Sequence, residues 1–144
     1  MKLPLIKTFM SAHIGLYRQT NGRLGHKALK HRFLLLTTIG RKSGQIHITP
    51  LSYFKDNGRY ILVASNWGRT NHPQWFLNLL ENPQTAIEVG PDHIHVKMTR
   101  ADGSEHDRLW QLVSRGNDHY TKYQRSISRQ IPIVVLLPVN QSAE

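Results

Sequence analysis

Residues 33–45 read FLLLTTIGRKSGQ, and this stretch decides the fold class. Its first seven residues are apolar or β-branched, which is typical of a strand, and the GRKSG that follows at residues 40–44 is typical of a tight turn. A second extended segment covers residues 46–55. The pattern therefore predicts a β-hairpin with a basic tip.

After this hairpin, the chain is predicted to continue as a β-meander. The DNG at residues 56–58 is a strong turn signal, and the YILVAS at residues 60–65 predicts a third strand. Residues 66–72 are a polar loop, after which a short helix begins at Pro73, and the Asn82-Pro83 pair ends that helix.

Alternation of apolar and polar residues then predicts a second hairpin from residues 85–89 and 94–98. Ser104, followed three residues later by Asp107, resembles a capping box and predicts the start of another helix. The nearly all-apolar IPIVVLLPV of residues 131–139 predicts a final strand that is covered on both faces.

These elements predict a mainly β chain with helices, of the α+β class. About six strands and three helices fit a small closed barrel, with an amphipathic helix at the N-terminus and helices after the third and fifth strands. We expect residues 1–144 to form a single domain, with the helix in residues 1–20 and the barrel core in residues 32–139.

Composition narrows the choice of partner and compartment. The 19 Lys and Arg outweigh the 9 Asp and Glu, so the net charge of +10 favours an anionic partner. We expect no nucleic acid, because aromatic residues are not interleaved with the cations. The absence of cysteine, of an export signal and of a spanning apolar run predicts a cytoplasmic protein.

The N-terminal segment leaves two interpretations open. Apolar and cationic residues alternate at helical spacing over residues 3–19. The apolar stripe can pack on the barrel, or it can dock peripherally on the inner face of a membrane.

The basic tip of the first hairpin is a candidate anion site. Arg41 and Lys42 provide two cations, and Ser43 and the turn amides can add hydrogen bonds around a phosphate. The alternative is an ordinary solvated hairpin end.

A second candidate site lies in residues 64–83, ASNWGRTNHPQWFLNLLENP, where a strand ends in a polar loop and a helix begins. Backbone groups of residues 64–67 can contact the edge of a planar ring, and the helix start favours negative charge. Trp75 and Phe76 would wall such a pocket, or they would simply fill the core.

Taken together and in order, several motifs resemble the deazaflavin-dependent nitroreductase family, a branch of the split β-barrel oxidoreductases that use flavins and deazaflavins. The resemblance covers about residues 33–138. It rests on LLTTIGRKSGQ (35–45), TPL (49–51), ASNWG (64–68), HPQWFLNLLENP (72–83), Leu109-Trp110, and the ending with Tyr120, Tyr123, Gln124, Arg129 and IPIVVLLP.

The resemblance implies a split β-barrel and the cofactor coenzyme F420, an 8-hydroxy-5-deazaflavin with a phosphodiester and an acidic oligoglutamate tail. Arg41, Lys42 and Ser43 would hold the phosphate region. The implied coenzyme contacts are completed by His47, Thr49, Pro50, Ala64, Ser65, Asn66, Trp67, Gly68 and Trp75. Two of these depart from the family pattern, since Asn66 stands where a Lys is often found and His47 where an Arg is often found.

The resemblance also implies the activity. The expected enzyme is an F420H2-dependent reductase that passes a hydride to a small organic acceptor: a quinone, a nitroaromatic compound or an activated alkene. Tyr120 and Tyr123 match tyrosines that line the acceptor pocket, and Ser65 would face the substrate. The alternatives are an FMN-dependent oxidoreductase and a non-catalytic protein that binds a cofactor or a fatty acid.

The histidines and the oligomeric state are the last features that the sequence addresses. His93 and His95 lie two residues apart on one face of a predicted strand, but no third ligand follows at metal spacing, so we expect no metal. Related barrels occur as monomers or homodimers, and the sequence does not choose between them.

Overall fold

A computed structural model describes residues 14–15, 17–18, 27–28, 31–115 and 118–139. The strands are β1 (Lys27–Ala28), β2 (His31–Ile39), β3 (Ile46–Asp56), β4 (Arg59–Val63), β5 (Gln84–Val89), β6 (Asp92–Arg100) and β7 (Ile133–Pro138). The helices are η1 (Asn66–Gly68, a 3-10 turn), α2 (Gln74–Glu81), α3 (Gly103–Ser114) and α4 (His119–Ser126).

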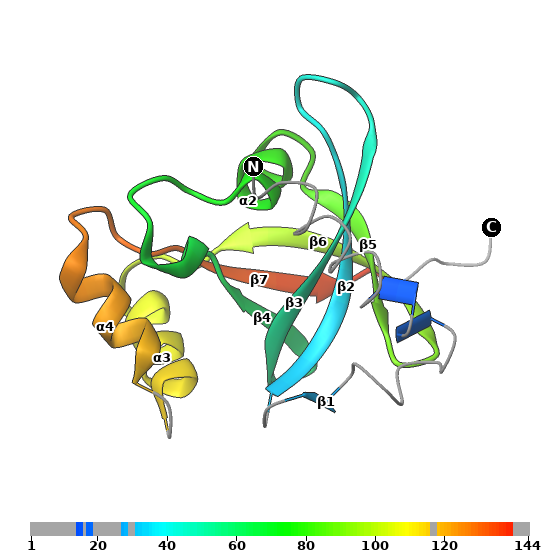
Figure 1. Cartoon of the computed structure of the whole chain (residues 1–144). Helices are drawn as coiled ribbons and strands as arrows, with labels where there is room; N and C mark the ends of the chain where they lie inside the picture. Colours follow the sequence, from blue (N-terminus) through cyan, green and yellow to red (C-terminus); the bar gives the residue numbers. More distant parts are fainter. Residues whose placement is uncertain (1–13, 16, 19–26, 29–30, 116–117, 140–144) are drawn as a thin grey trace.

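The strands form one antiparallel sheet in the order β1-β2-β3-β4-β7-β6-β5. A further pairing of β2 with β5 joins the two sides, so six strands close into a barrel. Figure 1 shows α3 and α4 at one end of this barrel and the β2–β3 hairpin projecting beyond it. The predicted six-stranded barrel, with helices after its third and fifth strands, is confirmed.

The long strand β3 is paired unevenly on its two sides. It pairs with β2 from Ile46 to Tyr53, but its pairing with β4 begins only at Phe54. Within the described residues, the other edge of residues 46–53 therefore has no strand partner. A proline fits such an edge because it lacks an N–H group to donate, and Pro50 lies in this part of β3.

Two apolar clusters fill the molecule. The larger one lies inside the barrel and under α2, and it includes Leu36, Leu62, Phe76, Leu79 and Leu136. The second packs α3 and α4 against the outside of β4 and β7; it includes Ile61, Leu109, Val113, Tyr120 and Val135. Because β7 contributes to both clusters, its residues Ile133–Leu136 are buried on both faces, as the apolar run predicted.

Three sequence predictions need correction or completion. The capping box at Ser104 was wrong, because α3 begins at Gly103 and its N-cap Asp102 makes no side-chain cap hydrogen bond. Burial on both faces does not extend to Leu137, which is 49% exposed. The helix α4 was not predicted.

The predicted N-terminal helix lies mostly outside the described residues. Residues 14–15 and 17–18 are helical, and Tyr17 is fully buried. The Tyr17 hydroxyl accepts a hydrogen bond from the backbone N–H of Gly90 at 2.6 Å. In the part of the chain that is described, no helix is long and apolar enough to cross a membrane.

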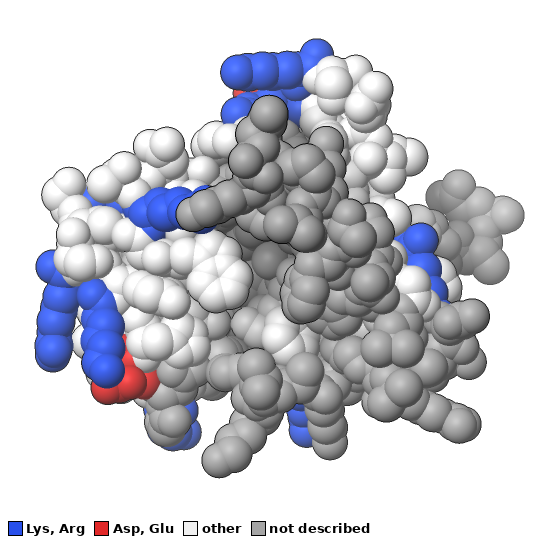
Figure 2. All heavy atoms as spheres, in the orientation of Figure 1, with Lys and Arg blue, Asp and Glu red and all other residues white. Residues whose placement is uncertain are grey.

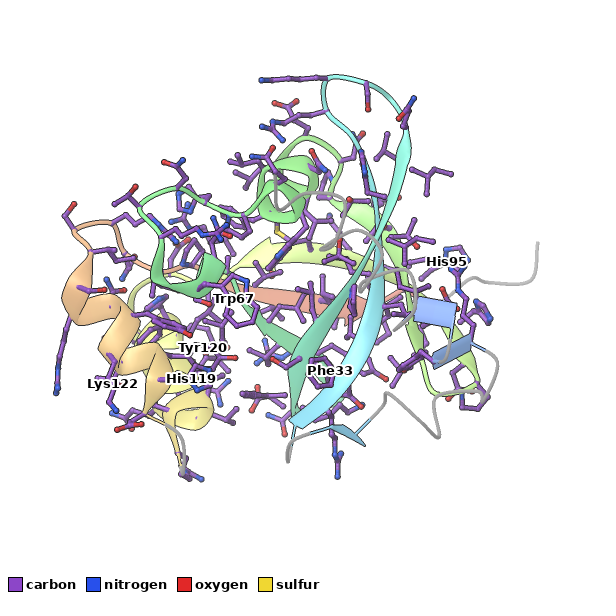
Figure 3. All side chains as sticks on the ribbon, viewed as in Figure 1. Phe33, Trp67, His95, His119, Tyr120 and Lys122 are labelled. Atoms are coloured by element: carbon purple, nitrogen blue, oxygen red, sulfur yellow. The ribbon has the colours of Figure 1, made fainter. Side chains whose placement is uncertain are left out.

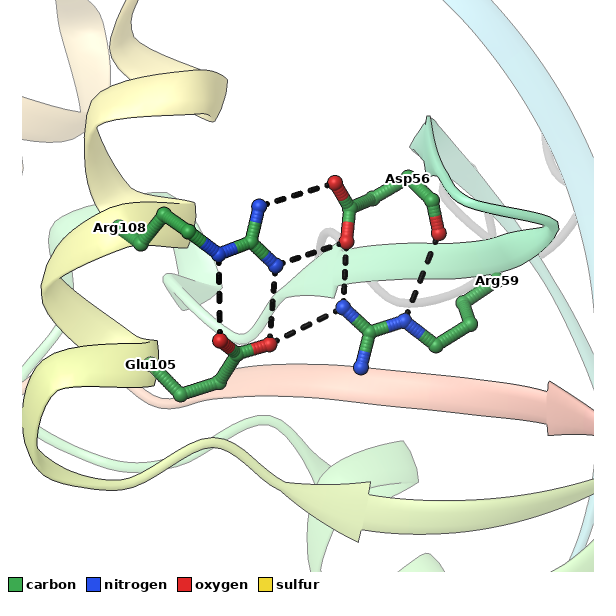
Figure 4. Close-up of polar contacts among 4 residues, drawn as sticks. All are labelled: Asp56, Arg59, Glu105 and Arg108. Atoms are coloured by element: carbon green, nitrogen blue, oxygen red, sulfur yellow. Dashed lines mark hydrogen bonds and ion pairs between the residues drawn. The ribbon is translucent and has the colours of Figure 1, made fainter.

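A network of four charged residues joins α3 to the turn between β3 and β4 (Figure 4). Asp56 is buried and accepts hydrogen bonds from Arg59 and, at 3.0 and 2.8 Å, from Arg108. Glu105 accepts from the same two guanidinium groups, each at 3.0 Å. These partners hold the pKa of Asp56 well below its ordinary value.

Candidate active site

The tip of the β2–β3 hairpin is a tight turn. The N–H of Gly40 donates to the carbonyl of Gln45 at 2.7 Å, and the N–H of Gly44 donates back to Gly40 at 2.8 Å. A side chain on Gly40 would collide with both Ser43 and His47, because a Cβ there would lie 2.5 Å from Ser43 Oγ and 2.9 Å from His47 Nε2. The structure therefore brings together Ser43 and His47, two residues of the predicted phosphate site.

Asn78 of α2 fastens this tip to the barrel. Its Oδ1 accepts hydrogen bonds from the backbone N–H of Arg41 at 3.2 Å and from Arg41 Nη1 at 2.9 Å. Its Nδ2 donates to Thr38 Oγ1 at 3.4 Å. Asn78 was not among the predicted site residues, although a buried asparagine in the apolar helix QWFLNLLE is a signal that points to a hydrogen-bonding role.

The cations of the tip are available to an anion. Arg41 and Lys42 form no ion pair with any carboxylate in the described part of the chain, whereas Arg59 and Arg108 are both paired. Figure 2 shows Lys and Arg side chains projecting from this tip. Two unpaired cations beside Ser43 and His47 form a set of donors that suits a phosphate group.

The loop after β4 has an unusual backbone. Asn66, Trp67 and Gly68 all have positive φ, at 50°, 59° and 76°. Only glycine adopts this region without strain, so two consecutive non-glycine residues there are a strained feature of the kind that gathers at functional sites. Ala64 and Ser65, which precede the turn, are buried, whereas Trp67 is 78% exposed.

The remaining residues of the predicted coenzyme set lie apart from this loop. Thr49 and Pro50 are half-buried on the part of β3 that lacks a second strand partner. Trp75 lies in the core, with its ring centroid 6.3 Å from that of Phe76. The structure thus gives Trp75 a packing role beneath α2.

The two tyrosines of α4 have different surroundings. Tyr120 is buried, with its hydroxyl 3.4 Å from Ser52 Oγ of β3 and its ring edge-on to Phe54. Tyr123 is half-buried and lies against the loop that follows β4, since a Cβ on Gly68 would be 2.7 Å from its Cδ1 atom. Tyr123 therefore touches the strained turn at Gly68.

His119 joins this group from the first turn of α4. Its ring centroid lies 4.1 Å from that of Tyr120 and 5.6 Å from that of Tyr123. Figure 3 shows Trp67, Tyr120 and His119 on the side of the barrel that carries α4. Burial raises the pKa of Tyr120 above its ordinary value, so its hydroxyl stays protonated at neutral pH.

Metal ligands do not gather in this region. Across the described residues, no three His, Asp or Glu side chains lie close enough together to hold a metal ion. His93 and His95 are both exposed on β6.

Comparison with known proteins decides the family. The model of the F420H(2)-dependent quinone reductase family matches residues 9–138, which is most of the chain. The chain belongs to the F420H(2)-dependent quinone reductase family. The expected split-barrel family is thereby confirmed.

Individual relatives agree with this family. An F420H(2)-dependent quinone reductase of Mycobacterium tuberculosis is 42% identical over 128 residues, which cover 86% of each chain. A solved F420-H2 dependent reductase is 31% identical, with a TM-score of 0.66, over 72% of this chain and 92% of that one. A structure described as a domain-swapped dimer is 26% identical, with a TM-score of 0.70, over 94% of this chain and 99% of that one.

Membership of the quinone reductase family identifies the chain as an F420H2-dependent reductase with coenzyme F420 as its cofactor. The structure fits this cofactor at the hairpin tip, where unpaired cations meet the hydrogen-bonding groups of Ser43 and His47. The individual site residues remain predictions. No contact role was predicted for His119, and Gln124 and Arg129 were matched to the family without any partner being predicted for them.

Proposed function

We propose that this reductase transfers a hydride from F420H2 to a quinone that binds beside the junction of α4 with the loop at residues 64–68. The observation that carries the proposal is the contact of Tyr123 with Gly68, which joins the helix expected to line the acceptor pocket to the loop expected to hold the deazaflavin ring. A hydride transfer requires donor and acceptor to lie in contact, and this junction supports such an arrangement.

The coenzyme would be held at two points. Arg41 and Lys42, with Ser43 and His47, would bind the phosphodiester and the acidic tail, because they offer unpaired charge and hydrogen-bond donors at one tip. The backbone of residues 64–68 would contact the ring. F420H2 supplies the hydride, and the protein supplies position, charge and exclusion of water.

Tyr123 is the residue that we assign to the acceptor. A quinone that accepts a hydride also takes up a proton to become a hydroquinone, and negative charge develops on its oxygen during the transfer. The Tyr123 hydroxyl would donate a hydrogen bond to that oxygen. Tyr120, whose hydroxyl is near Ser52 and whose ring lies in the core, would shape the pocket wall.

A titration followed by an acceptor panel tests this function. We expect the purified protein to quench F420 fluorescence on binding and to bind FMN more weakly. With saturating F420H2, we expect a naphthoquinone to be reduced faster than a nitroimidazole or an activated alkene. Tighter binding of FMN, or no turnover with any quinone, would contradict the proposal.

We also propose a cytoplasmic enzyme that docks peripherally on anionic membrane through residues 1–20. The support is the mixture of apolar and cationic residues in that segment, together with the lipid solubility of many quinones. The test is sedimentation with anionic and neutral vesicles. Salt-sensitive binding to the anionic vesicles that is lost on removal of residues 1–20 supports docking, and equal binding by the truncated protein contradicts it.

A further inference from the structure

The guanidinium group of Arg129, from the segment between α4 and β7, is hydrogen-bonded to the loop at residues 64–69. Its Nη2 donates to the carbonyl oxygens of Ser65 at 2.9 Å and Arg69 at 3.0 Å. Its Nε also donates to Arg69 at 3.2 Å, and its Nη1 donates to Ala64 at 3.3 Å. One side chain thus holds three carbonyl groups, on both sides of the strained turn.

The fourth partner of Arg129 is His72, which precedes α2. Because arginine can only donate, His72 Nδ1 accepts from Nη1 at 3.2 Å, so the imidazole carries its proton on Nε2. Burial, with Arg129 and Arg100 nearby, lowers the pKa of His72 below its ordinary value. The neutral ring that this hydrogen bond requires is therefore the favoured form.

Arg129 has no counter-ion in the described part of the chain, since none of its hydrogen-bond partners is a carboxylate. A half-buried guanidinium group with only neutral partners has a cost in desolvation free energy that no opposite charge offsets, and burial lowers the pKa of Arg129. The planar fork of an arginine is what allows several carbonyl groups to be held at once. This cost implies that the position of the loop matters to the protein.

The turn itself contributes little to its own geometry. Inside it, Gly68 donates to Ser65 at 3.0 Å and Arg69 donates to Asn66 at 3.1 Å. These two hydrogen bonds accompany two consecutive non-glycine residues with positive φ, Asn66 and Trp67. Backbone strain of this kind persists only where the surroundings over-determine it, and Arg129 supplies hydrogen bonds to carbonyl groups on both sides of the turn.

The backbone of Arg129 is also held by α4, the helix that is proposed to lie on the acceptor side. Gln124 of α4 donates through Nε2 to the carbonyl of Arg129 at 2.7 Å and accepts at Oε1 from the N–H of Ile131 at 2.8 Å. Gln124 directly follows Tyr123, which touches Gly68. The helix of the acceptor side and the loop of the coenzyme side are therefore joined through one guanidinium group.

We propose that Arg129 is a positioning residue for hydride transfer: it sets the loop at residues 64–69 at a fixed place relative to α4, so that coenzyme and acceptor meet at reacting distance. This inference rests on the proposed function. Displacements of about 1 Å can reduce a rate on the order of a hundredfold, so a loosened loop should affect turnover even with both ligands bound.

The first experiment compares Arg129→Lys with Arg125→Lys, an exposed control four residues earlier in the chain. Lysine keeps the charge but cannot reproduce the planar fork. In the protein without coenzyme, we expect Arg129→Lys to speed hydrogen exchange at the amides of Gly68 and Arg69 by about tenfold. At saturating F420H2 and quinone, we expect kcat to fall by about tenfold to a hundredfold, with the control unchanged.

A second variant distinguishes loss of the guanidinium group from misfolding of the protein. Arg129→Ala should lose kcat as Arg129→Lys does, and added guanidinium ion at non-denaturing concentration should restore part of it, whereas an equal concentration of sodium chloride should not. Wild-type kcat in Arg129→Lys, or no rescue of a folded Arg129→Ala protein by guanidinium, would overturn the proposal. Failure of the wild-type protein to bind F420 or to reduce quinones would instead count against the proposed function. The exchange rates would still test whether Arg129 holds the loop at residues 64–69.

Discussion

The ring of Tyr123 lies directly against Gly68, so closely that a Cβ on Gly68 would be 2.7 Å from Cδ1 and 3.0 Å from Cγ of the tyrosine. These atoms belong to the base of the ring and cannot move aside as the end of a flexible chain would. The loop and α4 therefore approach this closely because residue 68 is a glycine and has no side chain. Several measurable consequences follow from this contact and from the others around it.

Gly68→Ala should destabilise the protein more than Gly58→Ala does. Both glycines have φ near +77°, at 76° and 79°, but nothing lies within 4 Å of a Cβ at Gly58. The control should lose about 1 kcal/mol from the left-handed backbone alone. Gly68→Ala should lose about 1–3 kcal/mol more from the clash with Tyr123. Denaturant unfolding of the two variants measures the difference, and equal losses would mean that the ring moves away freely.

Replacement of both Arg41 and Lys42 by Ala should weaken coenzyme binding by about 3 kcal/mol, or on the order of a hundredfold in Kd. The melting temperature should change little, because the backbone N–H of residue 41 still bonds to Asn78. A fluorescence titration with F420 measures the affinity. The matched control removes Lys97 and Arg115, two exposed cations on other elements, and the assignment fails if both double variants bind alike.

Tyr123→Phe should lower kcat/KM for a quinone by about tenfold to a hundredfold, or about 1.4–2.7 kcal/mol, with the coenzyme Kd nearly unchanged. Tyr120→Phe keeps the buried ring and loses only a 3.4 Å contact with Ser52, so it should retain most activity. Steady-state kinetics of the two single variants decide between the hydroxyl groups. The larger loss in Tyr120→Phe would place the acceptor against β3 instead.

Asp56→Asn should destabilise the protein by about 2 kcal/mol at neutral pH, because two guanidinium groups lose a charged acceptor. The folded protein holds the pKa of Asp56 below its ordinary value of 3.8, so the unfolded chain takes up this proton first as pH falls. The contribution is fully present above that value and is lost progressively below it. The difference in free energy of unfolding between the wild type and Asp56→Asn should therefore shrink as pH falls from 7 to 3, and Asp107→Asn, an exposed change in α3, serves as the matched control variant.

The barrel was predictable because each of its hairpins has a local signal. The FLLLTTI run, the DNG turn and the alternation around residues 85–98 each specify their own strand, and short connections leave few topologies. The helix α4 was not predictable in the same way. Its sequence HYTKYQRS carries no apolar stripe, and it is helical because Tyr120 packs on the outside of the barrel.

The hydrogen-bond partners of the site residues could not be predicted from the sequence. Asn66 was interpreted as a missing cation, yet its Nδ2 donates to the carbonyl of Asn71 at 2.9 Å and so helps to hold the loop. Arg129 matched a family motif, but its four partners are 57 to 65 residues away in the chain. Contacts at such separation depend on barrel closure, which no local pattern encodes.

The separate attachment of α4 has a consequence for how such an enzyme can diversify. The pairing of β2 with β5 closes the barrel, and α4 is added to its outer surface by contacts with η1 and α3. If the acceptor binds beside α4 as proposed, mutations on the loop-facing side of this helix would change the choice of acceptor without opening the barrel. A single barrel can in this way give rise to reductases with one coenzyme and many oxidants.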